Sequence, residues 1–227
     1  MDIEAFSELF PLFNTASPET LQWLLSVAVE HSYPRDRAVL MEDAWGNAVY
    51  FIVSGWVKVR RLAGDSAATL AVMGKGDFFG EMAILDESPR STDVVALCKV
   101  ELLSVSAQRF IQTLFKDPQL HHRMLQLMVQ RLRYSNLRFL LRDRPPAVKL
   151  AKTLIVLADQ YGSTTEQGKE ILFIPYSDLS QISDIRVEEA QKIIEKLADK
   201  GWVNIDKSRH SLSLVNLRQL THLAGRM

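Results

Sequence analysis

Six arginines crowd into the 27-residue segment from Pro118 to Arg144, in which Asp143 is the only acidic residue. A guanidinium group stays charged at physiological pH and can hold a phosphate or carboxylate through two parallel hydrogen bonds. The segment carries a net charge of +5, although the 227-residue chain as a whole has 27 basic and 27 acidic residues. We interpret this segment as the binding site of an anionic partner. The six residues are Arg123, Arg131, Arg133, Arg138, Arg142 and Arg144.

The flanking segments differ in charge and together define a globular chain. Residues 1–117 contain 10 basic and 16 acidic residues, whereas residues 145–227 contain 11 and 10. A 47% hydrophobic composition and this length indicate one large domain or two modest ones. The apolar runs are shorter than the ~20 residues that span a bilayer, and the acidic N-terminus lacks the basic region of a secretory signal. We therefore expect a cytoplasmic protein without membrane contact.

Motifs for catalysis or metal binding are missing from the sequence. A single cysteine, Cys98, excludes an internal disulfide, a Cys-based zinc site and a cysteine-ligated iron–sulfur cluster. His121 and His122 are adjacent on an expected helix and point apart. There is no Walker loop, no HExxH-type spacing and no supported Ser/His/Asp arrangement. The sequence thus predicts a protein that is not an enzyme and holds no metal.

Short elements precede the arginine-rich segment. Residues 3–31 are expected to form short helices, one of them starting at Ser17-Pro18-Glu19, with a capping serine and proline in the first turn. Strands at 48–53 and 56–60 flank Ser54-Gly55, which predicts a tight hairpin. Many short strands at regular spacing predict a sandwich or barrel between residues 37 and 105. The other expected strands are 69–73, 94–97 and 100–105.

The arginine-rich segment itself has a helical pattern. A short helix is expected at 106–116, and residues 119–142 contain neither Gly nor Pro. Steps of three and four residues define a two-stranded coiled-coil seam, which predicts a homodimer through residues 119–142. The helix is expected to break at a hinge, Arg144-Pro145-Pro146. The seam residues are Leu125, Met128, Leu132, Ser135, Phe139 and Arg142.

The segment after the hinge has the pattern of a helix-turn-helix with a β-hairpin wing. A helix at 147–160 precedes a polar loop at 162–168 and a short strand at 171–174. A helix capped by Ser177 runs to Ser183. A second helix is expected at 186–200, and strands at 202–205 and 211–214 form the wing. The predicted fold class is α+β.

Three motifs now resemble the cyclic-AMP receptor / fumarate–nitrate regulator (CRP/FNR) family. They are Tyr50-Phe51-Ile52-Val53-Ser54-Gly55, the segment from Gly76 to Leu85, and Ser88-Pro89-Arg90-Ser91-Thr92. The resemblance extends from Phe10 to Leu217. It implies a dimeric transcription regulator in three parts: a jelly-roll-like cyclic-nucleotide-binding β-roll (1–117), a dimerisation helix (118–144) and a winged helix-turn-helix domain (145–227).

The resemblance also implies a nucleotide site in the segment from Phe79 to Ser91. Gly80 would allow close approach of the ligand, Glu81 would accept from a ribose hydroxyl, and Arg90 would bind a phosphate. Met82, Ser91 and Thr92 complete this set. Two alternatives stay open, because Arg90 could instead pair with Asp86 or Glu87, and Glu81 could be only the first acid of a helix.

Ser135 and Asn136 match the two polar positions that meet the ligand base in the family, one from each subunit. Their donors and acceptors suit a purine edge, although a polar seam residue can also serve only to set the dimer register. In a parallel dimer, Arg131, Arg138 and Arg142 would each approach their own copies and would repel one another. Either acids of the β-roll or a bound polyanion must lie among them. Cyclic di-GMP, with Tyr134 as a stacking partner, suits this seam, and cyclic AMP suits the β-roll.

The expected recognition helix is unusually acidic. Residues 174–196 have five acidic and three basic residues, which opposes phosphate neutralisation on DNA, and Asp184 stands at a turn position that is commonly glycine. We therefore keep two hypotheses: a DNA-binding regulator, and a cyclic di-GMP receptor that contacts a partner protein, such as another transcription factor. The candidate DNA contacts are Arg186, Val187, Glu188, Gln191 and Lys192 on the helix, and Lys207 and Arg209 on the wing.

Overall fold

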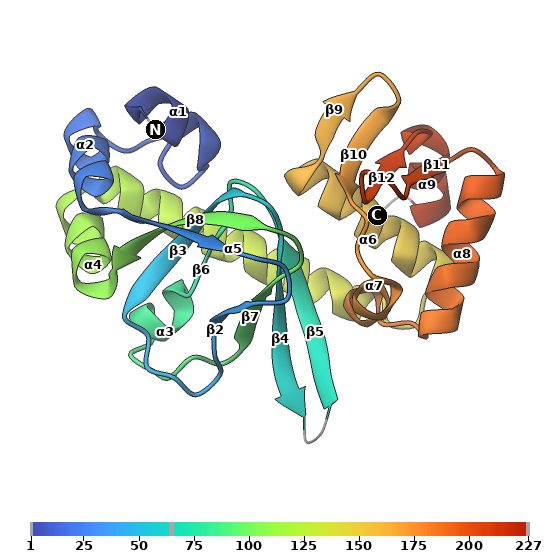
Figure 1. Ribbon diagram of the computed structural model, residues 1–227, viewed down its shortest axis with the longest axis horizontal. Coiled ribbons are helices and arrows are strands. Elements are labelled where there is room, and N and C mark those ends of the chain that lie inside the picture. The colour runs from blue at the N-terminus through green and yellow to red at the C-terminus, as the bar shows by residue number, and fades with distance from the viewer. Residues whose placement is uncertain (1, 64–65, 226–227) are drawn as a thin grey trace. The chain divides into compact units, whose positions relative to one another are not determined.

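A computed structural model describes residues 2–63 and 66–225 (Figure 1). The chain divides into an N-terminal unit, which ends at Tyr134, and a C-terminal unit, which begins at Ser135 and also includes residues 68–70. The boundary falls inside the longest helix. Across the described ranges, no helix combines the length and apolar character that crossing a membrane requires.

The N-terminal unit starts with two helices, α1 (Ile3–Leu9) and α2 (Pro18–Val27). The predicted start of α2 is confirmed, since the Ser17 hydroxyl accepts a hydrogen bond from the Thr20 N–H at 3.2 Å. The rings of Phe6 and Phe13 stack at 4.8 Å, and Phe13 lies 5.1 Å from Phe51. These contacts fix the helical region against strand β3 (Ala48–Ser54).

Among the residues that the structure describes in this unit, eight strands form two four-stranded sheets, with orders β1-β8-β3-β6 and β2-β7-β4-β5. Residues of both sheets, among them Ile52, Val57 and Leu102, share one buried cluster, which confirms the predicted sandwich. The strands are β1 (Val29–Tyr33), β2 (Ala38–Leu40), β3 (Ala48–Ser54), β4 (Val57–Ala63), β5 (Ser66–Met73), β6 (Phe78–Phe79), β7 (Asp93–Ala96) and β8 (Val100–Ser106).

Two expectations for this unit are wrong. The segment at Ser54-Gly55 is not a hairpin, because β3 pairs with β8 whereas β4 pairs with β7. Ile52 and Val57 both pack into the space between the sheets, so the turn at Gly55 (φ 86°) lays the two strands face to face rather than edge to edge. The predicted helical region also ends too late, because residues 29–31 belong to β1 and pair with β8.

Strand β6 and the helices after it position the candidate site. Phe78 packs toward the core beneath the helices, whereas Phe79 packs between the sheets, as alternation along a strand requires. A five-residue helix, α3 (Glu81–Leu85), follows Gly80, whose φ of 86° suits glycine. Helix α4 (Ala107–Lys116) confirms the prediction for that segment.

The long helix α5 (Pro118–Leu140) ends two residues before the predicted end. Leu120 and Met124 are buried in the core of the N-terminal unit. On other faces, Leu125, Leu132 and Phe139 are 55%, 61% and 72% exposed. These three belong to the predicted seam, so a single chain leaves that apolar stripe in water.

Up to residue 225, where the described part of the chain ends, the C-terminal unit contains four further helices and one sheet of order β11-β12-β10-β9. The predicted helix-turn-helix and its wing, β11 paired with β12, are confirmed. The elements are α6 (Pro146–Tyr161), β9 (Ser163–Thr165), β10 (Gly168–Leu172), α7 (Tyr176–Ser183), α8 (Val187–Asp199), β11 (Val203–Asp206), β12 (Ser211–Leu214) and α9 (Leu217–Ala224).

Three details of this unit correct the predictions. The polar loop expected at 162–168 contains strand β9, which forms because it pairs with β10. Ser177 does not cap α7, because the helix already starts at Tyr176 behind Pro175, whose φ is restricted to helix-compatible values. The structure also contains α9, which the sequence pattern did not reveal.

Candidate functional site

Arg90 is held in a narrow seat inside the N-terminal unit. Its side chain donates hydrogen bonds to the main-chain carbonyls of Gly80 and, at 2.7 Å, of Ala48, and the residue is only 4% exposed. A Cβ at Gly46 would lie 2.9 Å from Cζ of Arg90, and one at Gly80 would lie 2.8 Å from Nη1. A side chain at either position would displace the guanidinium from this place, and the φ of 86° at Gly80 independently favours glycine.

These contacts decide one of the alternatives that the sequence left open, namely whether Arg90 pairs with an acid of its own segment. Among the described residues, Arg90 makes no ion pair with Asp86 or Glu87. Burial lowers the pKa of the Arg90 guanidinium, and the nearby Tyr50 and Glu81 oppose that shift. A cation desolvated in this way gains strongly from any anion that reaches it.

Tyr50 forms an aromatic wall beside Arg90. Its ring stacks on Phe79 with a centroid distance of 5.5 Å and an interplanar angle of 6°. The His31 ring lies 5.9 Å from Tyr50, and its Nε2 is 2.8 Å from the Ser104 hydroxyl. Burial raises the pKa of Tyr50, Tyr33 adds to this, and Arg90 counteracts it. Sequence reasoning missed this wall. Its one signal in the sequence is that Tyr50 lies two residues before Ile52 and therefore on the same face of strand β3.

Glu81 is paired with Arg131 of α5 within the same unit. The Arg131 guanidinium donates to the carboxylates of Glu81 and Asp77 and to the carbonyl oxygen of Phe78, and lies 4.3 Å above the Phe78 ring. Glu81 is 2% exposed; burial raises its pKa, and Arg131 counteracts the shift. For Arg131, the structure thus supplies the acidic partners of the β-roll that the sequence left as one alternative.

The other predicted nucleotide-binding residues are not brought into this network. Met82 is 64% exposed on α3, Ser91 is exposed and Thr92 is half-buried. The structure therefore gathers Gly80, Glu81, Arg90 and Arg131. The predicted residues further along α5 and in the turn after it are all exposed: Tyr134, Ser135, Asn136, Arg138 and Arg142. Of these, Arg138 donates hydrogen bonds to the main-chain carbonyls of Leu70 at 2.8 Å and Gln181 at 3.1 Å.

On the predicted recognition helix α8, Val187, Glu188, Gln191 and Lys192 are exposed. Arg186 precedes the helix and is held by Glu189, whose carboxylate accepts from the Arg186 N–H at 3.0 Å and from its guanidinium at 3.1 Å.

The turn before α8 and the wing also hold ion pairs. Asp184 has a left-handed φ of 53°, a conformation that favours glycine. Its carboxylate accepts a hydrogen bond from the Lys149 ammonium at 2.9 Å, and this ion pair stabilises the turn. On the wing, Arg209 pairs with Glu170 at 3.1 Å, and Lys207 is exposed. Both arginines proposed for DNA, Arg186 and Arg209, are thus partly neutralised by acids of their own unit.

Metal chemistry finds no support in the ranges that the structure describes. Within residues 2–63 and 66–225, no three His, Cys, Asp or Glu side chains are grouped so that they could hold a metal ion. The chemistry of the site is therefore that of a buried guanidinium, a buried carboxylate and an aromatic wall, which suits recognition of an anionic, hydroxyl-bearing aromatic ligand.

Comparisons with known proteins agree on the architecture. The family model described as "Cyclic nucleotide-binding domain" matches residues 30–117. The cyclic AMP receptor protein of Thermus thermophilus is 30% identical over 198 residues, which cover 86% of this chain and 88% of that protein. FixK2 from Bradyrhizobium japonicum has a TM-score of 0.76 at 20% identity, over 88% of this chain and 99% of that one. The c-di-GMP-responsive global regulator CLP of Xanthomonas campestris has a TM-score of 0.68 at 21% identity, over 87% and 99%.

Proposed function

Because the chain belongs to the CRP/FNR family of transcription regulators, which are not enzymes, we propose that it is a homodimeric regulator that senses a cyclic nucleotide at Arg90 and Glu81. The observation that carries this proposal is the seat of Arg90, where two glycines and two carbonyls hold a buried guanidinium beside an aromatic wall. The phosphate of the ligand would take over hydrogen bonds that Arg90 now gives to the main chain.

The pairing of Glu81 with Arg131 links this site to the dimer helix. A ribose hydroxyl that donates to Glu81 would share its carboxylate with Arg131, and so would change how α5 is tethered to β6 and α3. Ligand binding would then favour one placement of the two α5 helices, and the hinge at 144–146 would pass it to the C-terminal unit. An effector acts in this way when its affinities for the two states differ by about 1–3 kcal/mol.

The exposed stripe of Leu125, Leu132 and Phe139 supports the dimer. A surface helix rarely leaves three large apolar side chains of one heptad pattern in water, and pairing with a second copy would bury them. In that dimer, Ser135 and Asn136 would reach the base of the ligand, as the family resemblance implies. We also propose that the chain has three functional parts, with boundaries after residues 117 and 144.

Cyclic AMP is the effector that we favour, because Arg131, the seam arginine nearest to the site, already has acidic partners. Cyclic di-GMP is the second candidate, favoured by the exposed Tyr134, Arg138 and Arg142. The Xanthomonas regulator shares only its fold at 21% identity, so it does not decide between them.

We expect calorimetric titration of the full-length protein to show one cyclic AMP per chain. The Arg138→Ala variant should bind it as wild type does, whereas Arg131→Ala should bind it more weakly because the Glu81 carboxylate loses its partner. If cyclic di-GMP binds instead and Arg138→Ala abolishes that binding, the seam is the site. If cyclic AMP, cyclic GMP and cyclic di-GMP all fail to bind, the proposed sensing function is wrong.

DNA binding should be weak and should depend little on salt, since two of the candidate cations are paired within the C-terminal unit. The logarithm of the binding constant falls by about 0.9 per neutralised phosphate for each tenfold rise in salt, so few free cations give a shallow slope. Fluorescence anisotropy with genomic fragments and nucleotide measures this slope. Lys192→Ala should reduce it, and Glu166→Gln should not. If nucleotide changes no DNA affinity at low salt, the partner-protein alternative replaces DNA binding.

A further inference from the structure

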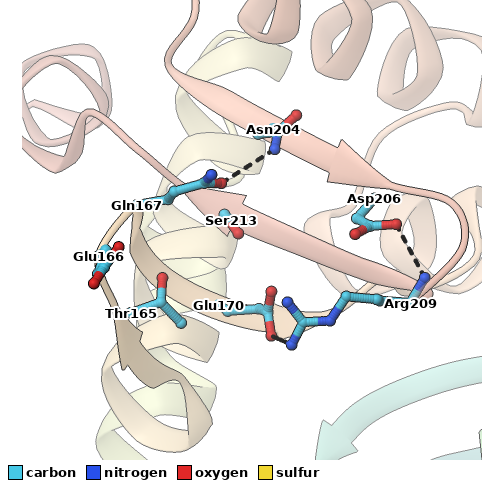
Figure 2. Close-up of a pocket in the computed structure, with 8 residues that line it drawn as sticks. All are labelled: Thr165, Glu166, Gln167, Glu170, Asn204, Asp206, Arg209 and Ser213. Carbon is cyan, nitrogen blue, oxygen red and sulfur yellow. Dashed lines mark hydrogen bonds and ion pairs between the residues drawn. The ribbon is translucent and has the colours of Figure 1, made fainter.

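A polar cleft on the C-terminal unit offers a second binding site. It has a volume of about 370 Å³ and lies on one face of the sheet β11-β12-β10-β9 (Figure 2). Asn204, Ser213 and Glu170 are register partners on three adjacent strands, so their side chains share that face. Leu212 and Leu214 alternate with Ser213 and point into the core on the opposite face. The cleft is therefore built on a rigid sheet.

The charges of the cleft select a cation. Glu166, Glu170 and Asp206 line it, and Arg209 is the only basic residue among the eight that do. Hydrogen bonds from the Ser208 hydroxyl and the Arg209 main chain lower the pKa of Asp206, which keeps this carboxylate ionised. Glu166 and Asp206 lie at opposite ends of the cleft, with Glu170 between them (Figure 2). A ligand with positive charge at each end would match this pattern.

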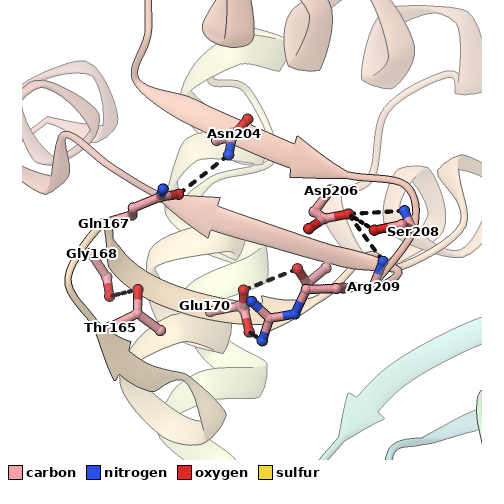
Figure 3. A network of polar contacts seen from close by, with 9 residues as sticks. Thr165, Gln167, Gly168, Glu170, Asn204, Asp206, Ser208 and Arg209 are labelled. Atoms are coloured by element: carbon pink, nitrogen blue, oxygen red, sulfur yellow. Dashed lines mark hydrogen bonds and ion pairs between the residues drawn. The ribbon is translucent and has the colours of Figure 1, made fainter.

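Ser213 supplies an independent sign of a ligand. The residue is 5% exposed and lies in the middle of the cleft (Figure 2). In the part of the chain that the structure describes, its hydroxyl makes no hydrogen bond, whereas its neighbours are engaged with one another (Figure 3). Arg209 holds Glu170, and Gln167 accepts from Asn204 at 3.4 Å. The Ser213 hydroxyl opens on the cleft and is not sealed from solvent, so a donor from a bound ligand would replace water there.

We propose that this cleft binds a linear aliphatic polyamine. One ammonium group would lie at Glu166 and another near Asp206, while an intervening N–H donates to Ser213 and methylene groups span the sheet. An organic cation fits better than a metal, because no metal-holding group is present in the described ranges. An ammonium beside Glu170 would also compete with Arg209 and so release this wing arginine from its internal ion pair.

Calorimetric titration of the full-length protein with spermidine, at fixed ionic strength, tests the proposal. We expect one spermidine per chain. Ser213→Ala should weaken binding at least threefold without lowering the unfolding midpoint, since the hydroxyl has no protein partner to lose. Glu166→Gln, at an exposed turn, should weaken it about threefold.

Asp199→Asn is the matched control, because it removes an exposed carboxylate of the same unit that does not line the cleft. It should bind spermidine as wild type does. The proposal is overturned if Asp199→Asn and Glu166→Gln weaken binding equally, which would indicate a general attraction to acidic surface. It is also overturned if Ser213→Ala leaves the affinity unchanged, or if wild type binds no spermidine.

Discussion

Replacing Asp117 with alanine is expected to lower the free energy of unfolding by about 2–4 kcal/mol, because one buried carboxylate caps two helices. Its Oδ2 accepts from the Ser17 N–H and the Thr20 hydroxyl, both at 3.0 Å, at the start of α2. Its Oδ1 accepts from the N–H groups of Gln119 (3.1 Å) and Leu120 (3.0 Å) at the start of α5. Loss of the side chain leaves four hydrogen-bond donors at the starts of the two helices without their acceptor: three main-chain N–H groups and one hydroxyl.

The same contacts make stability depend on pH. Burial alone would raise the pKa of Asp117, but the hydrogen bonds from Ser17, Leu120, Thr20 and Gln119 outweigh it and hold the pKa below its ordinary value. A carboxyl whose pKa is depressed by folding contributes stability above its unfolded pKa of about 3.9, and that stability is lost as the pH falls through the folded pKa. Wild type should therefore lose its advantage over Asp117→Asn only below about pH 4.

Urea unfolding at a series of pH values measures both effects. Asp2→Ala is the matched control, since Asp2 caps only α1, accepts from the Ala5 N–H at 2.8 Å and is exposed. It should cost about 1 kcal/mol or less. If Asp117→Ala is no more destabilising than Asp2→Ala, the double cap does not hold the two helices. A wild-type advantage over Asp117→Asn that grows below pH 4 would contradict the depressed pKa.

Local signals in the sequence were sufficient for most elements of the fold. The start of α2 depends on Ser17 and Pro18, which act within one turn, and α5 follows from the absence of Gly and Pro over 119–140. The connection at Ser54-Gly55 could not be predicted in the same way. A turn motif does not say whether the next strand continues the same sheet or crosses to the other, because strand partners 33 or more residues away decide it.

The candidate site could be predicted only in part. Glu81 and Arg131 were both identified, but they are 50 residues apart, and nothing in either motif indicates that the two side chains meet. Gly46 lies in a loop without a motif. Its role in making room for Arg90 is visible only in the structure, where a Cβ added at this position would lie 2.9 Å from Cζ of Arg90. Such contacts between distant segments are set by the packing of the sandwich and not by local pattern.

Arg90→Ala is expected to weaken cyclic AMP binding at least 30-fold, or about 2 kcal/mol, because the phosphate loses its charge-assisted partner in a desolvated seat. Arg90→Lys should lose less, since it keeps the charge, but it cannot reproduce a planar guanidinium that donates to both Gly80 and Ala48. Calorimetric titration compares the two variants with wild type.

Arg61→Ala is the control for this comparison, because Arg61 is an exposed arginine of β4 whose guanidinium lies 3.3 Å from Glu42. It should bind the nucleotide as wild type does. A urea midpoint within the wild-type range shows that Arg90→Ala remains folded, so that its lost affinity belongs to the site. If folded Arg90→Ala binds cyclic AMP as tightly as wild type, the seat of Arg90 is structural only. Sensing would then have to be sought at the exposed arginines of α5.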